Sequence, residues 1–595
     1  MYRFLALVLT LTMSLGASQA ADSSKTDLEG RRKALTNLLT EQWDYSLSTN
    51  PEYASVIGDK RWNDKSNDYS RAAVQKNLVK TAEFLKRFEA IDTAGFPEQE
   101  QLNKTLMIRE LRETLDGAKF KTWETPVTQF YGLHIGLAQN VSYLPFDTVK
   151  EFDDYIARLK NLPKQFDDVM ANMRAGMADG LMPPKILLDQ VVPQAHAIAG
   201  QEPEKSPFAQ PLDNFPKTAT AEEKTRVHDQ TIGAIRDLVL PAYAKFEKFV
   251  KDEYAPKGRK DPGVWALPDG SARYAFLVHH STTTNLTAEE IHTIGLKEVA
   301  RIEREMLGIA NKMGFKDLKS FDAAIDANPD LHGHSRQEFL DLYTRYIDQM
   351  YVKLPQLFGR LPKGKVVVKP TEDFREASAA GAEYNQGTPD GSRPGTVNVN
   401  TGDFAKRKTL NVETTAYHEG VPGHHLQIAI AQELESLPPF RRQGGNTAYV
   451  EGWALYSEDL GRDAGFFKDP YQMYGHYLDE MLRAIRLVVD TGLHAKHWTR
   501  EQVVQFFHDH SGTDEVEVQA ETDRYIAIPS QALGYKIGQL TIVRLRDKAK
   551  KKLGSKFDIR RFHDAILGAG SLPMDILETR IDGWIASEAN RTAAH

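Results

Sequence analysis

The chain has 595 residues, a formal net charge of −7 and no long run of basic side chains, which disfavours nucleic acid as a partner. It contains no cysteine, which excludes disulfides, a lipid-modified cysteine and a cysteine-rich structural metal site. The length is too great for one small core, so we expect either several domains or one large, two-lobed helical body.

The N-terminus, MYRFLALVLTLTMSLGASQAADSS, has the pattern of a secretory signal peptide. Arg3 precedes an apolar run, and small residues follow near Ala20 and Ala21. The alternative is a membrane anchor, but the run from Phe4 to Leu15 is short of the roughly 20 residues that a span needs. We therefore predict a signal peptide over residues 1–20, export to a periplasmic location, and no membrane span in the mature chain.

Helical periodicity covers most of the remaining chain. In one clear example, Thr287 and Glu290 have the spacing of a capping box, apolar residues follow at helical spacing, and Gly314 ends the pattern. Similar patterns predict helices over residues 28–47, 70–91, 148–178, 220–254, 335–360, 471–497, 531–552 and 573–588. The fold is therefore predicted to be mainly α.

Two Pro/Gly-rich stretches, residues 200–216 and 254–270, interrupt the helical patterns and are typical of exposed loops. The second stretch is a candidate boundary between an N-terminal helical half, residues 21–265, and a C-terminal half, residues 266–595. Strand patterns are few, and the clearest are residues 365–370 and 395–403. We expect them to form a short sheet beside the helix described next.

Residues 417–427, YHEGVPGHHLQ, suggest a metal site. They begin like the zinc-protease pattern H-E-x-x-H, in which two histidines four residues apart bind the metal and the glutamate acts as the base. His418 and Glu419 fit that pattern, but the next histidines, His424 and His425, come six and seven residues after His418. On a regular helix seven residues span about 10.5 Å, too far for two ligands of one zinc.

Pro422 and Gly423 offer a way to bring the histidines together. Proline removes a backbone hydrogen bond of a helix, and glycine adopts conformations closed to other residues, so we expect a bulge in the helix at this point. A single-zinc hydrolase also needs a third protein ligand. The segment AYVEGWALYSEDL, residues 448–460, offers Glu451 and Glu458, and the choice between them is open from spacing alone.

The segments HEGVPGHHLQ, YVEGWALYSEDLG, DGSRPGTVNVNT and RYIAIPSQALGYKIG resemble a widespread bacterial family. That family is catalogued as domain of unknown function 885 and is placed among the zinc metallopeptidases. The resemblance runs from about residue 30 to about residue 590, and the combination of HE with PGHH is far more specific than H-E-x-x-H alone. The layout is more distantly similar to angiotensin-converting enzyme, the thimet oligopeptidases and the thermostable bacterial carboxypeptidases. The resemblance implies a two-lobed, helical metallopeptidase-like body.

The resemblance also implies roles for individual residues. In the distant relatives the ligand glutamate follows the second histidine by about 24–26 residues. Glu451 follows His425 by 26 residues, so His425 is favoured as the second ligand and His424 is the alternative. The relatives place a tyrosine near the developing oxyanion, and Tyr535 matches it, although a core tyrosine is nearly as good an interpretation. They also align the substrate on an edge strand, which RPGTVNVNT, residues 393–401, would supply.

Arg524, Tyr525 and Lys536 could bind a substrate carboxylate, but structural ion pairs explain them equally well. The sequence therefore predicts an exported, Zn²⁺-dependent metallopeptidase acting on short peptides, with Glu419 as the base. The alternatives are a zinc amidase acting on another amide, such as a cell-wall cross-link, and a non-catalytic periplasmic peptide-binding protein. Exopeptidase or endopeptidase action, side-chain preference and oligomeric state stay open.

Overall fold

A computed structural model describes residues 5–372, 376 and 379–591, and side chains from Asp27 onward. The predicted signal peptide, residues 1–20, falls partly outside the described residues and otherwise where side chains are not described, so it stays a prediction. Within the described part of the chain, no helix combines the length and the apolar character needed to cross a lipid bilayer.

The protein is mainly α-helical, as predicted, and most predicted helical ranges are confirmed to within a few residues. The exceptions are the first helix, which begins at Leu5 instead of residue 28, and the range 220–254, which contains two α-helices and two π-helical turns. The helices of the N-terminal half are α1 (Leu5–Thr49), α2 (Pro51–Val56), α3 (Arg71–Glu89), α4 (Glu98–Ala118), α5 (Leu133–Asn140), α6 (Val149–Ala178), α7 (Lys185–Ala199), α8 (Ala221–Ala234) and α9 (Leu240–Phe249). Those that follow are α10 (Gly270–Thr282), α11 (Ala288–Lys312), α12 (Leu318–Asp326), α13 (Arg336–Leu357), α14 (Val412–Glu419), α15 (His424–Gln432), α16 (Pro439–Gln443), α17 (Thr447–Asp463), α18 (Pro470–Ala495), α19 (Arg500–His510), α20 (Glu515–Ala527), α21 (Leu533–Leu553), α22 (Ile559–Leu567) and α23 (Met574–Asn590). The capping box of Thr287 and Glu290 is present at the start of α11.

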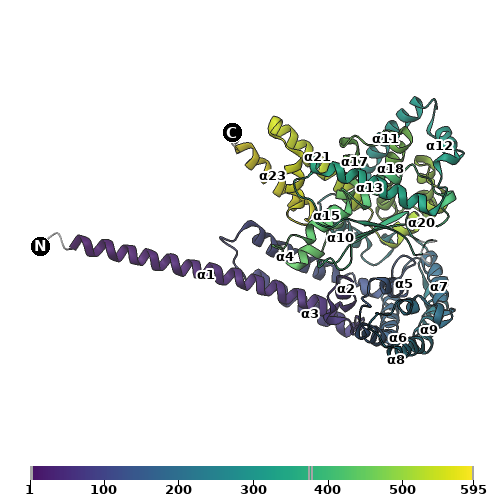
Figure 1. Ribbon diagram of the computed structural model, residues 1–595, viewed down its shortest axis with the longest axis horizontal. Helices are drawn as coiled ribbons and strands as arrows, with labels where there is room; N and C mark the ends of the chain where they lie inside the picture. Colours follow the sequence, from purple (N-terminus) through teal and green to yellow (C-terminus); the bar gives the residue numbers. More distant parts are fainter. Residues whose placement is uncertain (1–4, 373–375, 377–378, 592–595) are drawn as a thin grey trace.

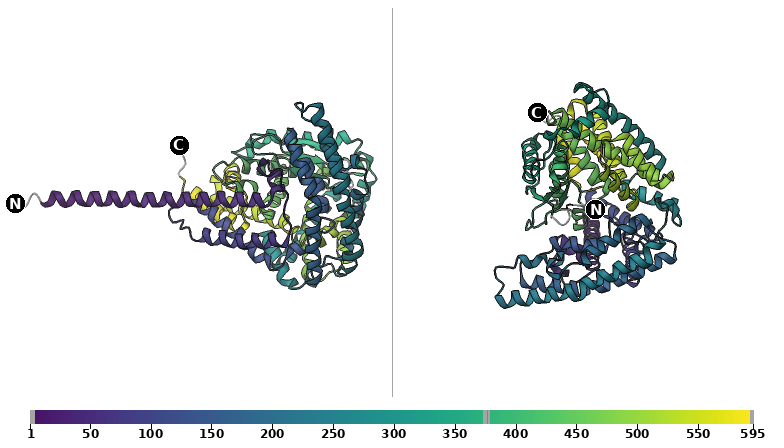
Figure 2. Two further views of the ribbon diagram at one scale, coloured as in Figure 1. Left: turned by 90° about the horizontal axis from the view of Figure 1, so that it is seen from below. Right: turned by 90° about the vertical axis from the view of Figure 1, so that its right-hand side faces the viewer.

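The helices form two groups. Figure 1 shows α2 to α9 on one side of the molecule and α11 to α23 on the other, while α1 extends away from the body. The right-hand view of Figure 2 shows the same two groups facing each other. Each group has its own core, because one cluster of buried side chains comes from residues 127–255 and the largest comes from residues 339–585 with Leu106. The boundary predicted at residues 265/266 stays a prediction.

A three-stranded sheet lies beside α14. Its strands are β1 (Val367–Pro370), β2 (Ala382–Asn385) and β3 (Thr396–Val399), in the order β1-β3-β2. β3 pairs in parallel with β1 and antiparallel with β2, and β2 contacts α14. β1 and β3 confirm the two predicted strands. The expectation that residues 393–401 form an edge strand is wrong, because β3 is the central strand and its hydrogen-bonding groups are used on both sides.

Two helices that carry candidate site residues, α17 and α21, pack at very close range. A Cβ added to Gly452 of α17 would lie 2.5 Å from the backbone of Gly538 of α21, and one added to Gly538 would lie 1.9 Å from the carbonyl oxygen of Ala448. Only glycine permits this approach. It fixes the distance between the residue before Gly452, which is Glu451, and the turn of α21 that carries Tyr535.

Candidate metal centre

The motif helix is broken into two helices instead of bulging. α14 ends at Glu419, the residues GVPG follow with a cis Val421–Pro422 peptide bond, and α15 begins at His424. The backbone N–H of Gly423 donates to the carbonyl of Tyr417 at 3.0 Å, and the indole N–H of Trp453 donates to the carbonyl of Pro422 at 2.9 Å. The connection is therefore tied both to α14 and to α17.

Gly423 is required at this break. A Cβ at this position would lie 1.9 Å from the carbonyl oxygen of His418 and 2.4 Å from that of Tyr417. Real side chains do not approach backbone oxygens this closely, so any other residue would displace the start of α15.

We expect Gly423→Ala to destabilise the protein by about 1–3 kcal/mol or more, because overpacking against backbone cannot be relieved by a side-chain rotation. Thermal unfolding monitored by circular dichroism measures the effect. Gly308→Ala in α11 is the matched control, since nothing lies within 4 Å of its added Cβ. That control should be neutral or stabilising by about 0.5–1 kcal/mol. A Gly423→Ala protein as stable as wild type would contradict the role given to this glycine.

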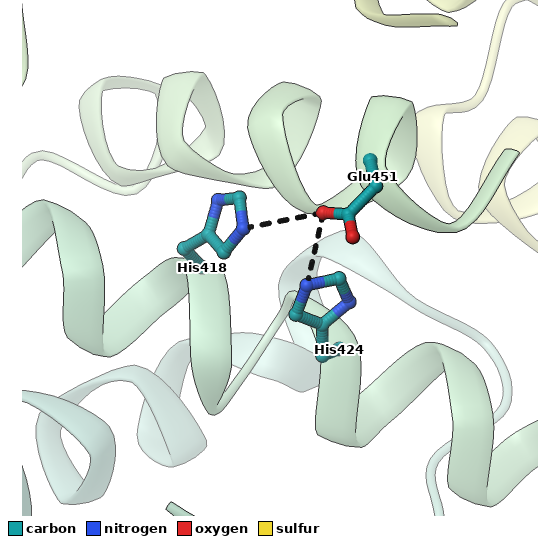
Figure 3. Close-up of side chains that lie close together, drawn as sticks. All are labelled: His418, His424 and Glu451. Atoms are coloured by element: carbon teal, nitrogen blue, oxygen red, sulfur yellow. Dashed lines mark ion pairs between the residues drawn. The ribbon is translucent and has the colours of Figure 1, made fainter. Parts of the chain in front are cut away.

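The break brings His418, His424 and Glu451 together. One ligand atom from each lies within 4.8 Å of the other two. Nε2 of His418 lies 3.8 Å from Oε2 of Glu451, and Nε2 of His424 lies 3.4 Å from the same oxygen (Figure 3). Both imidazoles are buried, and the Glu451 side chain is 20% exposed, so the site is open on the side of the carboxylate.

This donor set fits zinc. Ligand atoms about 2.0–2.1 Å from a tetrahedral zinc lie about 3.3–3.4 Å from one another, close to the two separations given above. Two imidazole nitrogens and one carboxylate, with a fourth position left for water, are the ligands of a catalytic zinc site. Nδ1 of His424 is buried and has no hydrogen-bond partner among the described residues.

The preference for His425 as the second ligand is wrong in geometry. Its Nε2 donates to the carbonyl of Gly364 at 3.1 Å, and its Nδ1 lies 3.2 Å from the hydroxyl of Tyr384 in β2. Burial lowers the pKa of His425 to about 4, so the ring is neutral and Nδ1 accepts the Tyr384 hydroxyl hydrogen. Both ring nitrogens are therefore used away from His418 and Glu451, and the alternative, His424, occupies the position beside them.

Glu458, the other candidate for the third ligand, instead binds the ring nitrogen of His418 that faces away from Glu451. Nδ1 of His418 donates to Oε1 of Glu458 at 2.7 Å, and the hydroxyl of Thr414 donates to Oε2 at 3.0 Å. Burial opposes a charge on His418, but hydrogen bonds to Glu451 and Glu458 outweigh it and raise its pKa to about 10 in the metal-free protein. Such a partner fixes the tautomer and orientation of a ligand histidine. The signal in the sequence is the seven-residue separation from Glu451, which puts both carboxylates on one face of α17.

Glu419 lies at the end of α14 beside the three ligand candidates. Its side chain makes no hydrogen bond to another described residue and is partly exposed. Burial raises its pKa, although the charges on His418 and His424 act in the opposite direction. A carboxylate that is close to the metal position but not committed to a partner is able to accept a proton.

The four other predicted residues lie in different surroundings. Tyr535 is 8% exposed, and its hydroxyl accepts a hydrogen bond from Nη2 of Arg524 at 3.3 Å. Tyr525 is fully buried and donates its hydroxyl hydrogen to Glu521. Lys536 is also fully buried, and its Nζ donates to Glu480 at 2.6 Å. The structural interpretation therefore holds for Tyr525 and Lys536, and neither is available to a substrate carboxylate.

Comparison with known proteins identifies the family of this chain. The model of a family described as "Bacterial protein of unknown function (DUF885)" matches residues 51–581. The chain belongs to this family. Among curated proteins there is no match.

Two solved structures have a fold similar to that of this DUF885 protein. One, "the putative lipoprotein from Colwellia psychrerythraea", is 29% identical, with a TM-score of 0.88 over 94% of this chain and 99% of that one. The other, "a putative lipoprotein of unknown function from Shewanella oneidensis", is 20% identical, with a TM-score of 0.68 over 92% of this chain and 99% of that one. The second likeness concerns the fold alone.

Proposed function

We propose that this DUF885 protein is a zinc-dependent peptidase that hydrolyses short peptides. The observation that carries the proposal is the convergence of His418, His424 and Glu451 within 4.8 Å, with Glu419 beside them and its side chain not hydrogen-bonded to any other described residue. A structural metal site needs no additional uncommitted carboxylate, whereas a hydrolytic site does.

Individual residues would have different roles in hydrolysis. Zinc, when bound, would polarise the amide carbonyl and lower the pKa of water. Glu419 accepts a proton from the attacking water and returns it to the leaving amine. Glu458 keeps Nδ1 of His418 as a donor, so Nε2 faces the site. Tyr535 stays our candidate for a hydroxyl donor to the developing oxyanion.

We also propose that the protein is exported. The pattern of residues 1–20 is that of a signal peptide, and the structural neighbour from Colwellia psychrerythraea is described as a putative lipoprotein. A lipid attached through cysteine is excluded for this chain, because it contains none.

Of the two strands β2 and β3, we propose β2 as the one that aligns a peptide substrate, because it lies at an edge of the sheet whereas β3 is paired on both sides.

The test combines metal analysis with a peptide-library digest read by mass spectrometry. We expect about one zinc per chain after purification and peptide cleavage that a chelator stops and added zinc restores. Absence of bound transition metal, even after zinc is offered, would contradict the metal site. A zinc-loaded protein that binds peptides but cleaves none would favour a binding protein, and cleavage of cell-wall amides alone would favour an amidase.

A further inference from the structure

Three arginines gather around Tyr535, and we call Arg483, Arg486 and Arg524 the arginine cluster. The first two come from α18 and the third from α20. Cζ of Arg486 lies 4.7 Å from the centroid of the Tyr535 ring, and Arg524 donates to the Tyr535 hydroxyl at 3.3 Å. Cζ of Arg524 also lies 5.7 Å from the ring centroid of Phe130, which belongs to the N-terminal half and is 46% exposed. The cluster therefore lies where the two halves meet.

The cluster carries more positive charge than its neighbours neutralise. Glu521 accepts hydrogen bonds from Arg486 at 2.9 Å and from Arg524 at 3.2 Å. Burial opposes this carboxylate charge, but the arginines outweigh it and hold the pKa of Glu521 at about 2. Burial raises the pKa of Asp479, which pairs with Nη1 of Arg483 at 3.6 Å, and raises the pKa of Glu517 to about 7. Glu458 also acts on Arg483, but this carboxylate is hydrogen-bonded to His418 at 2.7 Å. One further anion can therefore bind with favourable charge.

Arg483 has a free edge suited to a carboxylate. Its Nη1 donates to the carbonyl of Asp479 at 3.1 Å, while its Nε is buried without a hydrogen-bond partner. Its Nη2 makes no hydrogen bond to a described residue either. Nε and Nη2 together form the edge of a guanidinium group that binds a carboxylate through two parallel hydrogen bonds. The side chain is 12% exposed, so such a contact would be largely shielded from water.

The position of Arg483 distinguishes it from other arginines with an unpaired Nε. Asp479, which Arg483 contacts, accepts a hydrogen bond from the hydroxyl of Thr415 at 3.2 Å. Thr415 lies one helical turn before Glu419 on α14. Arg546 also has a buried Nε without a partner, but it contacts Tyr456, five residues after Glu451 on α17. Five residues turn a helix by about 500°, so Arg546 lies on the opposite side of α17 from the candidate metal centre.

We propose that the arginine cluster binds the free carboxylate at the C-terminus of the peptide substrate, with the Nε and Nη2 edge of Arg483 as the main contact. This rests on the proposed function and adds which end of the peptide enters the site. The protein then removes residues from the C-terminus of short peptides. The exposed ring of Phe130 beside Arg524 favours an apolar side chain at that end.

The test uses dansyl-penta-alanine as the free acid and as the C-terminal amide. The dansyl group blocks the N-terminus, so cleavage must be directed from the other end or occur internally. We expect kcat/KM for the acid to exceed that for the amide by about 10–100-fold, the range for a hydrogen-bonded charge pair. Mass spectrometry should show loss of C-terminal residues. Equal rates for acid and amide would overturn the proposal without any variant.

Arg483→Lys keeps the positive charge and loses the two-pronged edge. It should bring the acid-to-amide ratio close to one, mainly by slowing cleavage of the acid. The matched control is Arg546→Lys, whose side chain is 15% exposed and pairs with Asp463 at 3.0 Å, and which should keep the wild-type ratio. A wild-type ratio in Arg483→Lys would overturn the proposal. If this variant does not fold, Arg524→Lys takes its place.

Failure of the peptidase assignment gives a different result. If the wild-type protein cleaves neither probe, fluorescence anisotropy of the dansyl group measures binding to the zinc-loaded protein. Tighter binding of the acid than of the amide, lost in Arg483→Lys, supports the carboxylate site even though the peptidase proposal fails. Equal binding of the two probes, or binding of neither, would overturn the carboxylate site.

Discussion

Glu419→Gln should lower the rate of peptide hydrolysis by at least about 10²-fold while the protein keeps its zinc, since proton transfer by a placed side chain contributes about 10²–10⁴-fold. The amide has the size of the carboxylate but cannot accept the proton. The Glu419 side chain makes no hydrogen bond to another described residue, so the change should leave the folded structure and the thermal midpoint near wild type.

The comparison requires zinc content, thermal stability and the initial rate on a peptide identified by the library digest. Glu413→Gln is a matched control on the same helix. Glu413 is buried, accepts a hydrogen bond from Tyr417 at 2.9 Å and lies six residues before Glu419, on another face of α14. Its replacement should leave the rate within a few-fold of wild type, because glutamine still accepts that bond. A zinc-loaded Glu419→Gln protein that cleaves at the wild-type rate would falsify the assignment of the base.

His424→Ala should reduce bound zinc from about one per chain to nearly none and abolish hydrolysis with it. The variant removes one of two imidazoles from a site that has only three protein ligands, and a single-zinc site does not survive that loss. His425→Ala should keep the zinc. It removes the partner of Tyr384 and Gly364, so it should cost about 1–3 kcal/mol of stability instead.

These adjacent histidines are controls for each other, because both are buried and belong to the first turn of α15. Elemental analysis after dialysis, together with thermal unfolding of each variant, separates loss of metal from loss of fold. Zinc retained by His424→Ala and lost by His425→Ala would reverse the assignment drawn from the structure and restore the one drawn from the sequence.

The error over His425 has a definite physical origin. The spacing argument counted residues as if helical register continued from His418 into α15. The backbone of Gly420 and Gly423 leaves the helical region, with ψ of −116° and −127°, and this resets the register between the two helices. A glycine pair in a sequence indicates that a break is allowed but does not give its angles, so the choice between neighbouring histidines needed coordinates.

Elsewhere in the fold, features set by the local sequence could be predicted, whereas features set by contacts between distant residues could not. Long amphipathic helices such as α11 and α18 could be predicted, because their apolar spacing and caps are local. β2 could not, since the four residues AEYN include no β-branched side chain, are too few for their alternation to indicate a strand, and gain their strand conformation from pairing with β3. The burial of Lys536 was also hidden, because its partners Glu298 and Glu480 are distant in sequence.

One helix, α17, sets both sides of His418. Glu451 lies beside Nε2 of His418 and Glu458 pairs with Nδ1, and the two glutamates are seven residues apart on the same helix. If α17 shifts slightly, both carboxylates move with it. The distance between them is therefore set by the helix and not by the conformation of the loops or of the sheet. The His418 ring therefore lies between two carboxylates of the same helix, and the contact of Gly452 with Gly538 packs that helix against α21. In the metal-free protein the His418 ring is therefore already oriented for metal binding. The conformational entropy of ordering this ligand is lost during folding and not when the ion binds.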